Sequence, residues 1–180
     1  MRIDGHWART LDAAWLRAHI AVVSQAPTLF ATTVRDNIAL GSGASDAEVR
    51  HAAARAGAAA FIEALPEGYA TRLGADATQL SGGQAQRVAL ARALVRRAAR
   101  ILVLDEFTAA LDPATRGAVA DEVLRRGAAA PTVLMLTHDA ALMQQCDRLL
   151  VLDAGRVAYD GPPAPWLGAR AEQQRAAGWW

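Results

Sequence analysis

The sequence contains no lysine, and all nineteen of its basic residues are arginines. Eighteen acidic residues leave a formal net charge of +1, so the chain as a whole has no electrostatic field that would hold nucleic acid or an anionic membrane surface. We therefore expect no nucleic-acid partner. Any site for a phosphate group must be built locally from a few residues.

Cysteine and long apolar runs are also scarce. Cys146 is the single cysteine and cannot close an internal disulfide, so we interpret it as a small buried residue rather than a reactive thiol. The residues after Met1 include no apolar signal segment, which predicts a reducing, cytosolic environment. The longest apolar runs, such as 101–104, fall far short of the roughly 18 residues that span a bilayer.

The apolar residues are arranged in short β-branched runs that alternate with amphipathic helical windows. This pattern is typical of an α/β fold with a mostly parallel sheet, and 180 residues with 53% hydrophobic content suit one compact domain. The predicted strands are 20–24, 101–104, 132–136, 149–152 and 156–159. The first three are short and continuously apolar, which predicts strands covered on both faces.

Capping residues predict where several helices begin. A capping box, from Ser45 to Glu48, leads into a helix over 47–56, and a second box at Ser81 and Gln84 opens a longer helix through 97. Asp112-Pro113 supplies an N-cap and a proline at the first helical position for a helix to about residue 126. The residues 153–156 predict the turn of a closing β-hairpin.

The segment 34–73 contains helix signals and no convincing strand, so we expect an inserted helical subdomain over about residues 34–97 that includes the helix after Ser81. Prolines at 162, 163 and 165 should stop regular structure. The sequence thus predicts one domain over 1–161 and a weakly ordered tail over 162–180.

Asp105 and Glu106 directly follow the apolar run 101–104. A buried parallel strand delivers both carboxylates to its carboxyl end, where ligands bind in open α/β sheets. Asp105 is then placed to hold Mg²⁺ through water, and Glu106 to polarise a water for attack on a phosphoryl group. The alternative is a solvated acidic pair in a strand-to-loop turn.

Two glycines follow Ser81 at the start of the predicted long helix. Gly82 and Gly83 allow close backbone approach, and the free N–H groups and positive dipole end of the helix favour an anion. A capping box alone explains Ser81 and Gln84 but leaves the paired glycines unexplained. We favour contact with a phosphate group.

Two further polar residues follow predicted strands. His138 comes after the run 133–136 and Thr137, where it is placed to donate to a γ-phosphate oxygen or to orient a water, although a lone histidine is more often structural. Gln25 follows the strand 20–24 and offers a carbonyl oxygen to a metal or a water. By itself it carries little information.

Together these residues resemble the nucleotide-binding domain of ABC transporters, a P-loop NTPase family. The segment LSGGQAQR (80–87) is similar to the family signature, ILVLDE (101–106) to its Walker B strand and AALD (109–112) to its D-loop. Gln25 resembles the Q-loop glutamine, and His138 resembles the switch histidine. The similarity covers roughly residues 2–160.

A finer resemblance is to the exporter type. The segment SQAPTLFATTVRDNI (24–38) looks like the part of an exporter that receives a coupling helix from the transmembrane domain. GGQAQR and DEFTAALD resemble the CydD half of the heterodimeric cysteine/glutathione exporters. This likeness implies a location at the cytoplasmic face of the inner (plasma) membrane, through a membrane domain that this chain does not contain.

The resemblance implies a division of roles in a head-to-tail dimer of two such domains with ATP and Mg²⁺. Ser81, Gly82, Gly83 and Gln84 would face a nucleotide held by the partner, and Asp112 would cross to the partner's site, although an N-cap explains Asp112 equally well. The residues that would serve the chain's own nucleotide are Asp105 and Gln25 at the metal, and Glu106 and His138 in catalysis.

The chain departs from the family pattern in one large respect. The family needs a Walker A loop, GxxxxGK[ST], upstream of the Q-loop, and a sequence without lysine cannot contain it. We therefore expect a partial domain that starts inside the family fold. Within it, alanines at 75 and 77 stand where exporters have a glutamate and a glycine, and Phe107 replaces a small residue, which indicates a packing change.

Two alternative functions stay open at this point. One is a catalytically inactive remnant that acts only as a binding module, which the missing loop favours. The other is an ABC ATPase of DNA repair or chromosome maintenance. Those proteins usually separate the signature from the rest of the domain by long coiled coils, and this chain has no heptad segment.

Overall fold

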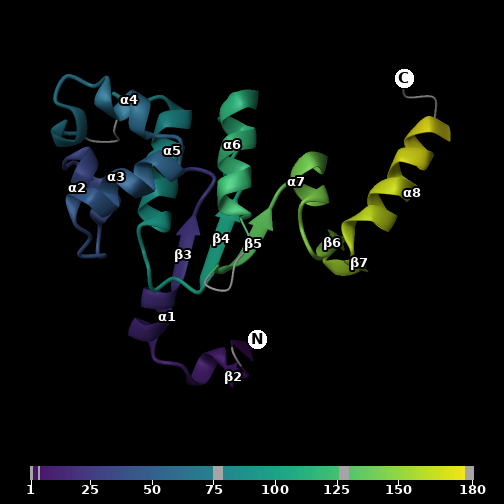
Figure 1. The fold of residues 1–180 in the computed structure, drawn as a ribbon. Coiled ribbons are helices and arrows are strands. Elements are labelled where there is room, and N and C mark those ends of the chain that lie inside the picture. Colours follow the sequence, from purple (N-terminus) through teal and green to yellow (C-terminus); the bar gives the residue numbers. More distant parts are fainter. Residues whose placement is uncertain (1, 4, 75–78, 126–129, 177–180) are drawn as a thin grey trace. The chain divides into compact units, whose positions relative to one another are not determined.

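The computed structural model describes residues 2–3, 5–74, 79–125 and 130–176. The chain divides into two compact units, Met1–Leu136 and Thr137–Trp180, and each is described by itself. In the first unit a parallel sheet meets a group of helices, and in the second a β-hairpin is followed by a helix (Figure 1).

The sheet of the first unit has three parallel strands in the order β3-β4-β5. They are β3 (Ile20–Val23), β4 (Ile101–Asp105) and β5 (Thr132–Leu136). Val23 pairs with Leu104, and Leu104 pairs with Met135, so the carboxyl ends of all three strands lie at one edge. The predicted α/β fold with a parallel sheet is confirmed.

The strands alternate between buried and exposed positions, and the expectation that both faces are covered is wrong. Leu102 and Leu104 are buried on β4, whereas Val22 is 60% exposed and Leu134 is 52% exposed. Helix α5 packs against β3, and the alternation of burial along the strands means that one face of the sheet is more covered than the other. A continuous apolar run allows a strand to be buried on both faces. It does not show that helices or strands actually cover both faces.

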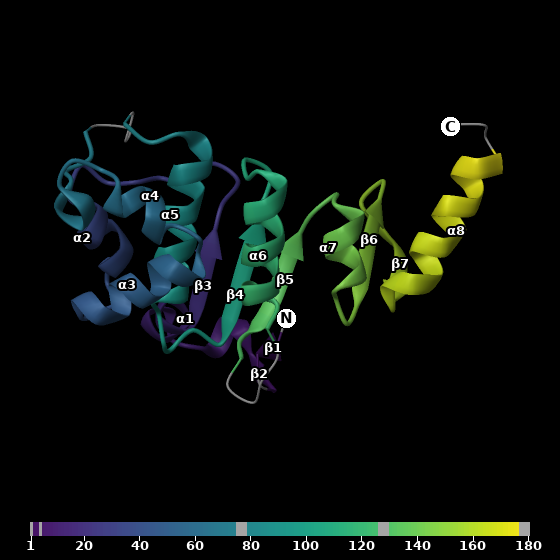
Figure 2. The same cartoon turned by 45° about the horizontal axis from the view of Figure 1, so that its top comes forward.

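The helical segment between β3 and β4 gathers around α5 (Figures 1 and 2). Its elements are α2 (Val34–Ala39), α3 (Asp46–Arg55), α4 (Ala59–Glu63), the short 3₁₀ helix η2 (Gly68–Ala70) and α5 (Gly82–Leu94). The fully buried side chains at its centre include Ile38, Val49, Ile62 and Val88. Each such side chain contributes about 1.5–3 kcal/mol through burial, which holds these short helices together.

Both predicted capping boxes are present. In α3 the Ser45 hydroxyl accepts from the Glu48 backbone N–H, and the Glu48 carboxylate accepts from the Ser45 backbone N–H at 2.7 Å. The helix begins at Asp46 and ends at Arg55, one residue earlier at each end than expected. The helix after Ser81 ends at Leu94 rather than at residue 97.

Several elements of the first unit carried no clear sequence signal. Two short antiparallel strands, β1 (Arg2–Ile3) and β2 (His6–Trp7), precede a 3₁₀ turn, η1 (Ala8–Thr10), and α1 (Ala13–His19). The Asp12 carboxylate caps α1 by accepting from the Trp15 backbone N–H at 2.8 Å.

After β4, α6 (Pro113–Val123) begins with the proline that its sequence predicted.

The second unit consists of α7 (Ala140–Gln144), an antiparallel hairpin of β6 (Leu149–Asp153) and β7 (Arg156–Gly161), and α8 (Pro163–Ala176). The hairpin and its turn are confirmed, with Ala154 and Gly155 at φ values of 44° and 74°. Two positive φ values in succession are typical of a type I′ turn, whose twist matches that of the paired strands.

The expectation that prolines stop regular structure after residue 161 differs from the observed α8. Pro162 directly precedes this helix, and Pro163 and Pro165 lie in its first turn. The N–H groups of the first turn have no partner inside a helix, so proline costs no hydrogen bond there. Proline at these positions starts a helix rather than preventing one.

None of the described helices is both long and apolar enough to cross a membrane. This finding agrees with the short apolar runs of the sequence.

Candidate functional site

Two carboxylates lie at the carboxyl edge of the parallel sheet, as the sequence predicts. Asp105 is the last residue of β4 and pairs in register with Leu136 of β5. The Glu106 backbone N–H donates to the Leu136 carbonyl oxygen at 3.1 Å, so the chain stays at this edge for one residue beyond the strand. This edge is where α/β sheets bind ligands.

Glu106 has a strained backbone, with a φ of 48°. A non-glycine residue in this left-handed region costs of order 1–3 kcal/mol and persists only where its surroundings fix it. Here the Glu106 carbonyl oxygen accepts from the Ala109 N–H at 3.0 Å, and the intervening side chains of Phe107 and Thr108 are buried. Strain of this kind is concentrated at active sites.

Phe107 itself is 1% exposed and is the largest of the fully buried side chains. Its burial confirms that the departure at this position is a packing change. The ring occupies the interior directly after the two carboxylates, which anchors the loop that presents them.

Gln25 lies two residues beyond the end of β3, and its side chain is exposed. Because β3 and β4 run parallel with Val23 opposite Leu104, Gln25 and Asp105 belong to the same edge of the sheet. The preceding Ser24 carbonyl oxygen accepts from the Gln86 side-chain amide at 3.2 Å. The start of this loop is therefore held by α5.

The N-terminus of α5 contains a complete capping box. The Ser81 backbone N–H donates to the Gln84 side-chain oxygen at 2.9 Å, and the Gln84 backbone N–H donates to the Ser81 hydroxyl oxygen at 3.2 Å. The capping interpretation is thus confirmed for both residues. The box does not involve the N–H groups of Gly82 and Gly83, at the first two helical positions, so the end of α5 can be capped and still offer donors to an anion.

The two glycines differ in their surroundings. A Cβ atom at Gly82 would meet nothing within 4 Å, whereas a Cβ at Gly83 would lie 2.4 Å from the Ala110 carbonyl oxygen. Gly83 is therefore required by packing against the loop that follows Glu106. The structure brings the segment 81–84 and the segment 109–112 together, which no local sequence signal reveals because the two are far apart in the chain.

Asp112 caps α6, since its carboxylate accepts from the Thr115 backbone N–H at 3.0 Å. Hydrogen bonds from the Thr115 side chain and backbone lower the pKa of Asp112 below its usual value. The N-cap interpretation is confirmed. A second role toward a partner subunit stays a prediction.

His138 belongs to the second unit, where it is the second residue after β5 ends at Leu136. Next to it, the Asp139 backbone N–H donates to the Thr137 hydroxyl oxygen at 3.0 Å. The convergence of His138 with the residues of the first unit stays a prediction. The departures at Ala75 and Ala77 lie outside the described residues.

The donor set at the sheet edge fits a magnesium ion that is shared with a phosphate. Among the described residues there is no group of three or more histidine, cysteine, aspartate or glutamate side chains arranged for a metal. Mg²⁺ is usually bound by one or two carboxylates together with waters and substrate phosphates rather than by a closed protein cage. The Asp105 carboxylate and the Gln25 amide oxygen supply ligands of that kind.

Comparison with known proteins decides the family. The sequence model described as "ABC transporter" matches residues 1–109, more than half of the chain. The chain belongs to the ABC transporter family. The segments 80–87 and 101–106, which resemble the signature and the Walker B strand, both lie within the matched residues.

The relatives of this ABC domain include the mitochondrial potassium channel ATP-binding subunit of Rattus norvegicus, 45% identical over 161 residues. ABC transporter B family member 1 of Arabidopsis thaliana is 44% identical over 160 residues, and the heterocyst differentiation ATP-binding protein HepA of Nostoc is 42% identical over 160. Each alignment covers 88% of this chain, but only 22%, 12% and 26% of the respective relative.

A solved structure of a bacterial Atm1-family ABC exporter with ATP bound is similar to this ABC domain, with a TM-score of 0.85 and 40% sequence identity. The alignment covers 94% of this chain and 29% of that one. This likeness confirms the resemblance to exporter-type domains that the sequence predicts. The resemblance to the cysteine/glutathione exporters is not tested by these relatives and stays a prediction.

Proposed function

We propose that this ABC domain is the C-terminal part of an exporter subunit, in which ATP hydrolysis at a head-to-tail interface between two such domains drives transport across a membrane. The observation that carries the proposal is the packing of Gly83 against the Ala110 carbonyl. It joins the signature helix to the loop that begins at Glu106. One chain can then serve a partner's nucleotide and its own at the same time.

At the N-terminus of α5, the Ser81 hydroxyl and the N–H groups of Gly82 and Gly83 would contact the γ-phosphate of an ATP held by the partner. The aligned peptide dipoles place roughly half a positive charge at this end of the helix. Gln84 keeps the first turn in shape through the capping box. No arginine or lysine is needed for this contact.

At the sheet edge, Asp105 and Gln25 would hold Mg²⁺, which when bound neutralises charge on the phosphates. Glu106 would accept a proton from the attacking water, which requires a fixed position close to the sheet edge. The strained turn at Glu106 and the buried Phe107 supply that fixed position. His138 would orient the water or donate to the γ-phosphate, and Asp112 would reach the partner's site.

The segment after β3 would receive a coupling helix of the transmembrane domain. Phe30 and Leu40 are 48% and 43% exposed, while Leu29, Val34 and Ile38 nearby are buried. Exposed large apolar side chains on a well-packed scaffold are suited to a partner surface. Docking of this kind would hold the domain at the cytoplasmic face of the membrane.

A second function is favoured by one specific observation. The 180 residues contain no lysine, and hence no GxxxxGK[ST] loop to grip the phosphates of a nucleotide. By itself this chain would act as a binding module that completes a partner's ATP site through α5, without hydrolysing ATP of its own.

A chimera tests the proposed function. Residues 1–160 would replace the matching segment of the bacterial Atm1-family exporter, and ATPase activity would be measured in the assembled dimer. We expect Glu106→Gln to slow hydrolysis by about two orders of magnitude or more while nucleotide-driven closure is retained. An unchanged rate in the Glu106→Gln chimera would remove Glu106 from the role of base.

A further inference from the structure

The segment between β3 and the end of α2 is held by side chains of α5 at three backbone carbonyls. Near its start, the Gln86 side-chain amide donates to the Ser24 carbonyl oxygen at 3.2 Å. Gln86 is only 3% exposed, so its amide is committed to this contact rather than to water. Helix α5 therefore buries the polar side chain of Gln86, which holds the start of the segment after β3.

Arg92, further along α5, makes three hydrogen bonds to the same segment. Its Nε donates to the Asn37 carbonyl oxygen at 2.7 Å, one terminal nitrogen donates to the Thr28 carbonyl oxygen at 2.8 Å, and the other donates to the Asn37 side-chain oxygen at 2.8 Å. The guanidinium also lies 5.4 Å from the centre of the Phe30 ring. Burial lowers the pKa of Arg92, but the residue stays charged at neutral pH.

Asn37 connects Arg92 to the backbone around Phe30. It is completely buried, and its side-chain oxygen accepts from the Phe30 backbone N–H at 2.8 Å as well as from Arg92. Its amide donates to the carbonyl oxygens of Phe30 and Thr33 at 2.9 and 3.0 Å. The conformation around Phe30 is thus set by Asn37, and Asn37 is held by Arg92.

We infer that Gln86 and Arg92 are positioning residues that make α5 and the segment 24–37 one rigid body. This inference rests on the proposed function, in which the N-terminus of α5 faces a nucleotide and the segment around Phe30 faces a transmembrane helix. Gly82 and Arg92 are ten residues apart on one helix, or about 15 Å along its axis. A shift of α5 on nucleotide contact is then delivered to the docking segment without passing through the sheet.

Arginine is required at position 92 because one planar fork reaches three acceptors on two parts of the segment. A lysine keeps the charge and most of the apolar stem, but a single ammonium group cannot reproduce this arrangement. Arg92→Lys therefore separates the linking role from the charge. Arg97, which is exposed and paired with Glu48, provides the matched control as Arg97→Lys.

The test measures a distance distribution in the 180-residue chain by double electron–electron resonance. Spin labels would be attached at Ala31→Cys and Gly82→Cys in a Cys146→Ser background, since Ala31 is exposed and a side chain at Gly82 has open space. We expect one narrow distribution in the parent and in Arg97→Lys, and a distribution at least twice as broad in Arg92→Lys. Circular dichroism at the same temperature confirms that each variant is folded.

A distribution that is as narrow in folded Arg92→Lys as in the parent would overturn the inference, and so would a broad distribution in the parent. If Arg92→Lys does not fold, Gln86→Met serves as a second variant that removes the donor to Ser24. It should broaden the distance distribution between spin labels at Ala26→Cys and Gly82→Cys. An unchanged width there would also overturn it. The experiment contains no nucleotide or partner, so its failure is distinct from failure of the proposed function.

Discussion

Glu106, the proposed general base, has an unfavourable backbone conformation. Its φ of 48° lies in a region that glycine enters freely and that other residues enter at a cost. The apolar run before Glu106 predicts its place at the sheet edge. Its backbone strain depends on the turn formed with Ala109 and on the burial of Phe107. No local pattern in the sequence indicates it.

Replacing Glu106 with glycine should therefore relieve strain. We expect Glu106→Gly to be more stable to urea than Glu106→Ala by about 1 kcal/mol. At His51, an exposed residue inside α3, the order should reverse, because glycine inside a helix is about 0.5–1 kcal/mol less favourable than alanine. The same order at both positions would show that Glu106 is not strained.

The two signature glycines should respond differently to alanine. Gly83→Ala forces a Cβ to within 2.4 Å of a backbone carbonyl, so we expect a loss of about 1–3 kcal/mol in unfolding free energy. Gly82→Ala meets nothing within 4 Å and should leave stability unchanged or slightly higher. Urea titration followed by circular dichroism measures both, and equal losses would argue against the contact with Ala110.

At the level of elements, the helices and strands with complete local signals were predictable. The three parallel strands, the hairpin and the helices capped by Ser45, Ser81 and Asp112 began at or next to the predicted residues, because apolar runs and caps act locally, whereas the helix ends were predicted less well. The helix α8 was missed because its prolines were interpreted as terminators. The packing of Gly83 on Ala110, and the contacts of Arg92, join distant segments and left no local signal.

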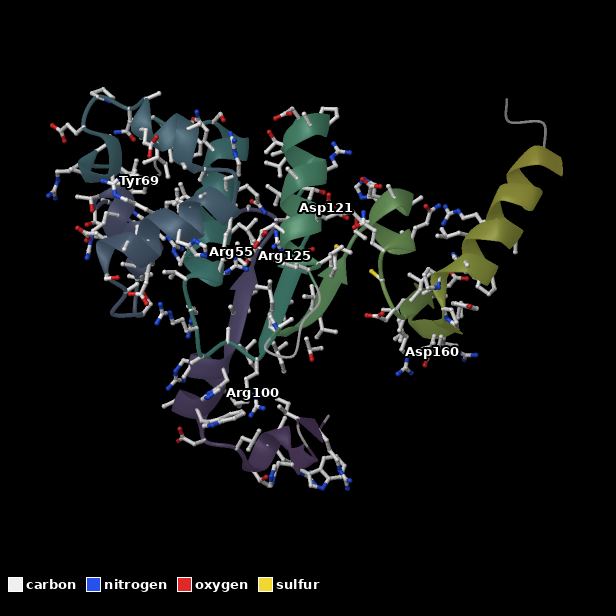
Figure 3. The ribbon with its side chains drawn as sticks, in the orientation of Figure 1. Arg55, Tyr69, Arg100, Asp121, Arg125 and Asp160 are labelled. Carbon is white, nitrogen blue, oxygen red and sulfur yellow. The ribbon has the colours of Figure 1, made fainter. Side chains whose placement is uncertain are left out.

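Glu122 links two elements through charge. Its carboxylate accepts from Arg55 of α3 at 2.6 Å and from Arg125 just beyond α6 at 2.5 Å, and Figure 3 shows the two arginines close together. Partial burial raises the pKa of Glu122, but the two arginines outweigh it and the net pKa is lowered. A lowered pKa in the folded state means that ionised Glu122 stabilises the fold.

This stabilisation should depend on pH in a defined direction. It is fully present above the ordinary glutamate pKa of 4.5 and is lost as the pH falls through the lower pKa of the folded state. We expect Glu122→Gln to weaken the decline of the melting temperature between neutral pH and pH 3. The exposed Glu67→Gln serves as a control and should retain the parental decline. Identical pH profiles for parent and Glu122→Gln would contradict this account.

At the scale of the whole molecule, the proposed function assigns to this chain parts of two composite sites. The family, the fold and the likeness to exporter-type domains follow from the sequence and its relatives. The spatial relation of His138 to Asp105 and Glu106 stays a prediction, because His138 belongs to the second unit and the two carboxylates belong to the first.

The 180-residue chain should not bind ATP by itself. Without a GxxxxGK[ST] loop it lacks most of the donors to the phosphates, each charge-assisted hydrogen bond being worth about 1.5–3 kcal/mol. We expect isothermal titration calorimetry to detect no saturable ATP site near physiological concentration. A stoichiometric site in that titration would require a phosphate-binding element elsewhere in the chain.

The most direct test of the central claim is ATP-dependent association of this chain with a partner's loaded site. The partner would be the isolated nucleotide-binding domain of the bacterial Atm1-family exporter. The residue of that domain that aligns with Glu106 would be changed to glutamine, and sedimentation velocity would report the complex. We predict a heterodimer with Mg-ATP, none without nucleotide, and none with Ser81→Arg, which places bulk at the start of α5. The account would be contradicted if no heterodimer forms with Mg-ATP. It would also be contradicted if the heterodimer forms equally well without ATP and with Ser81→Arg.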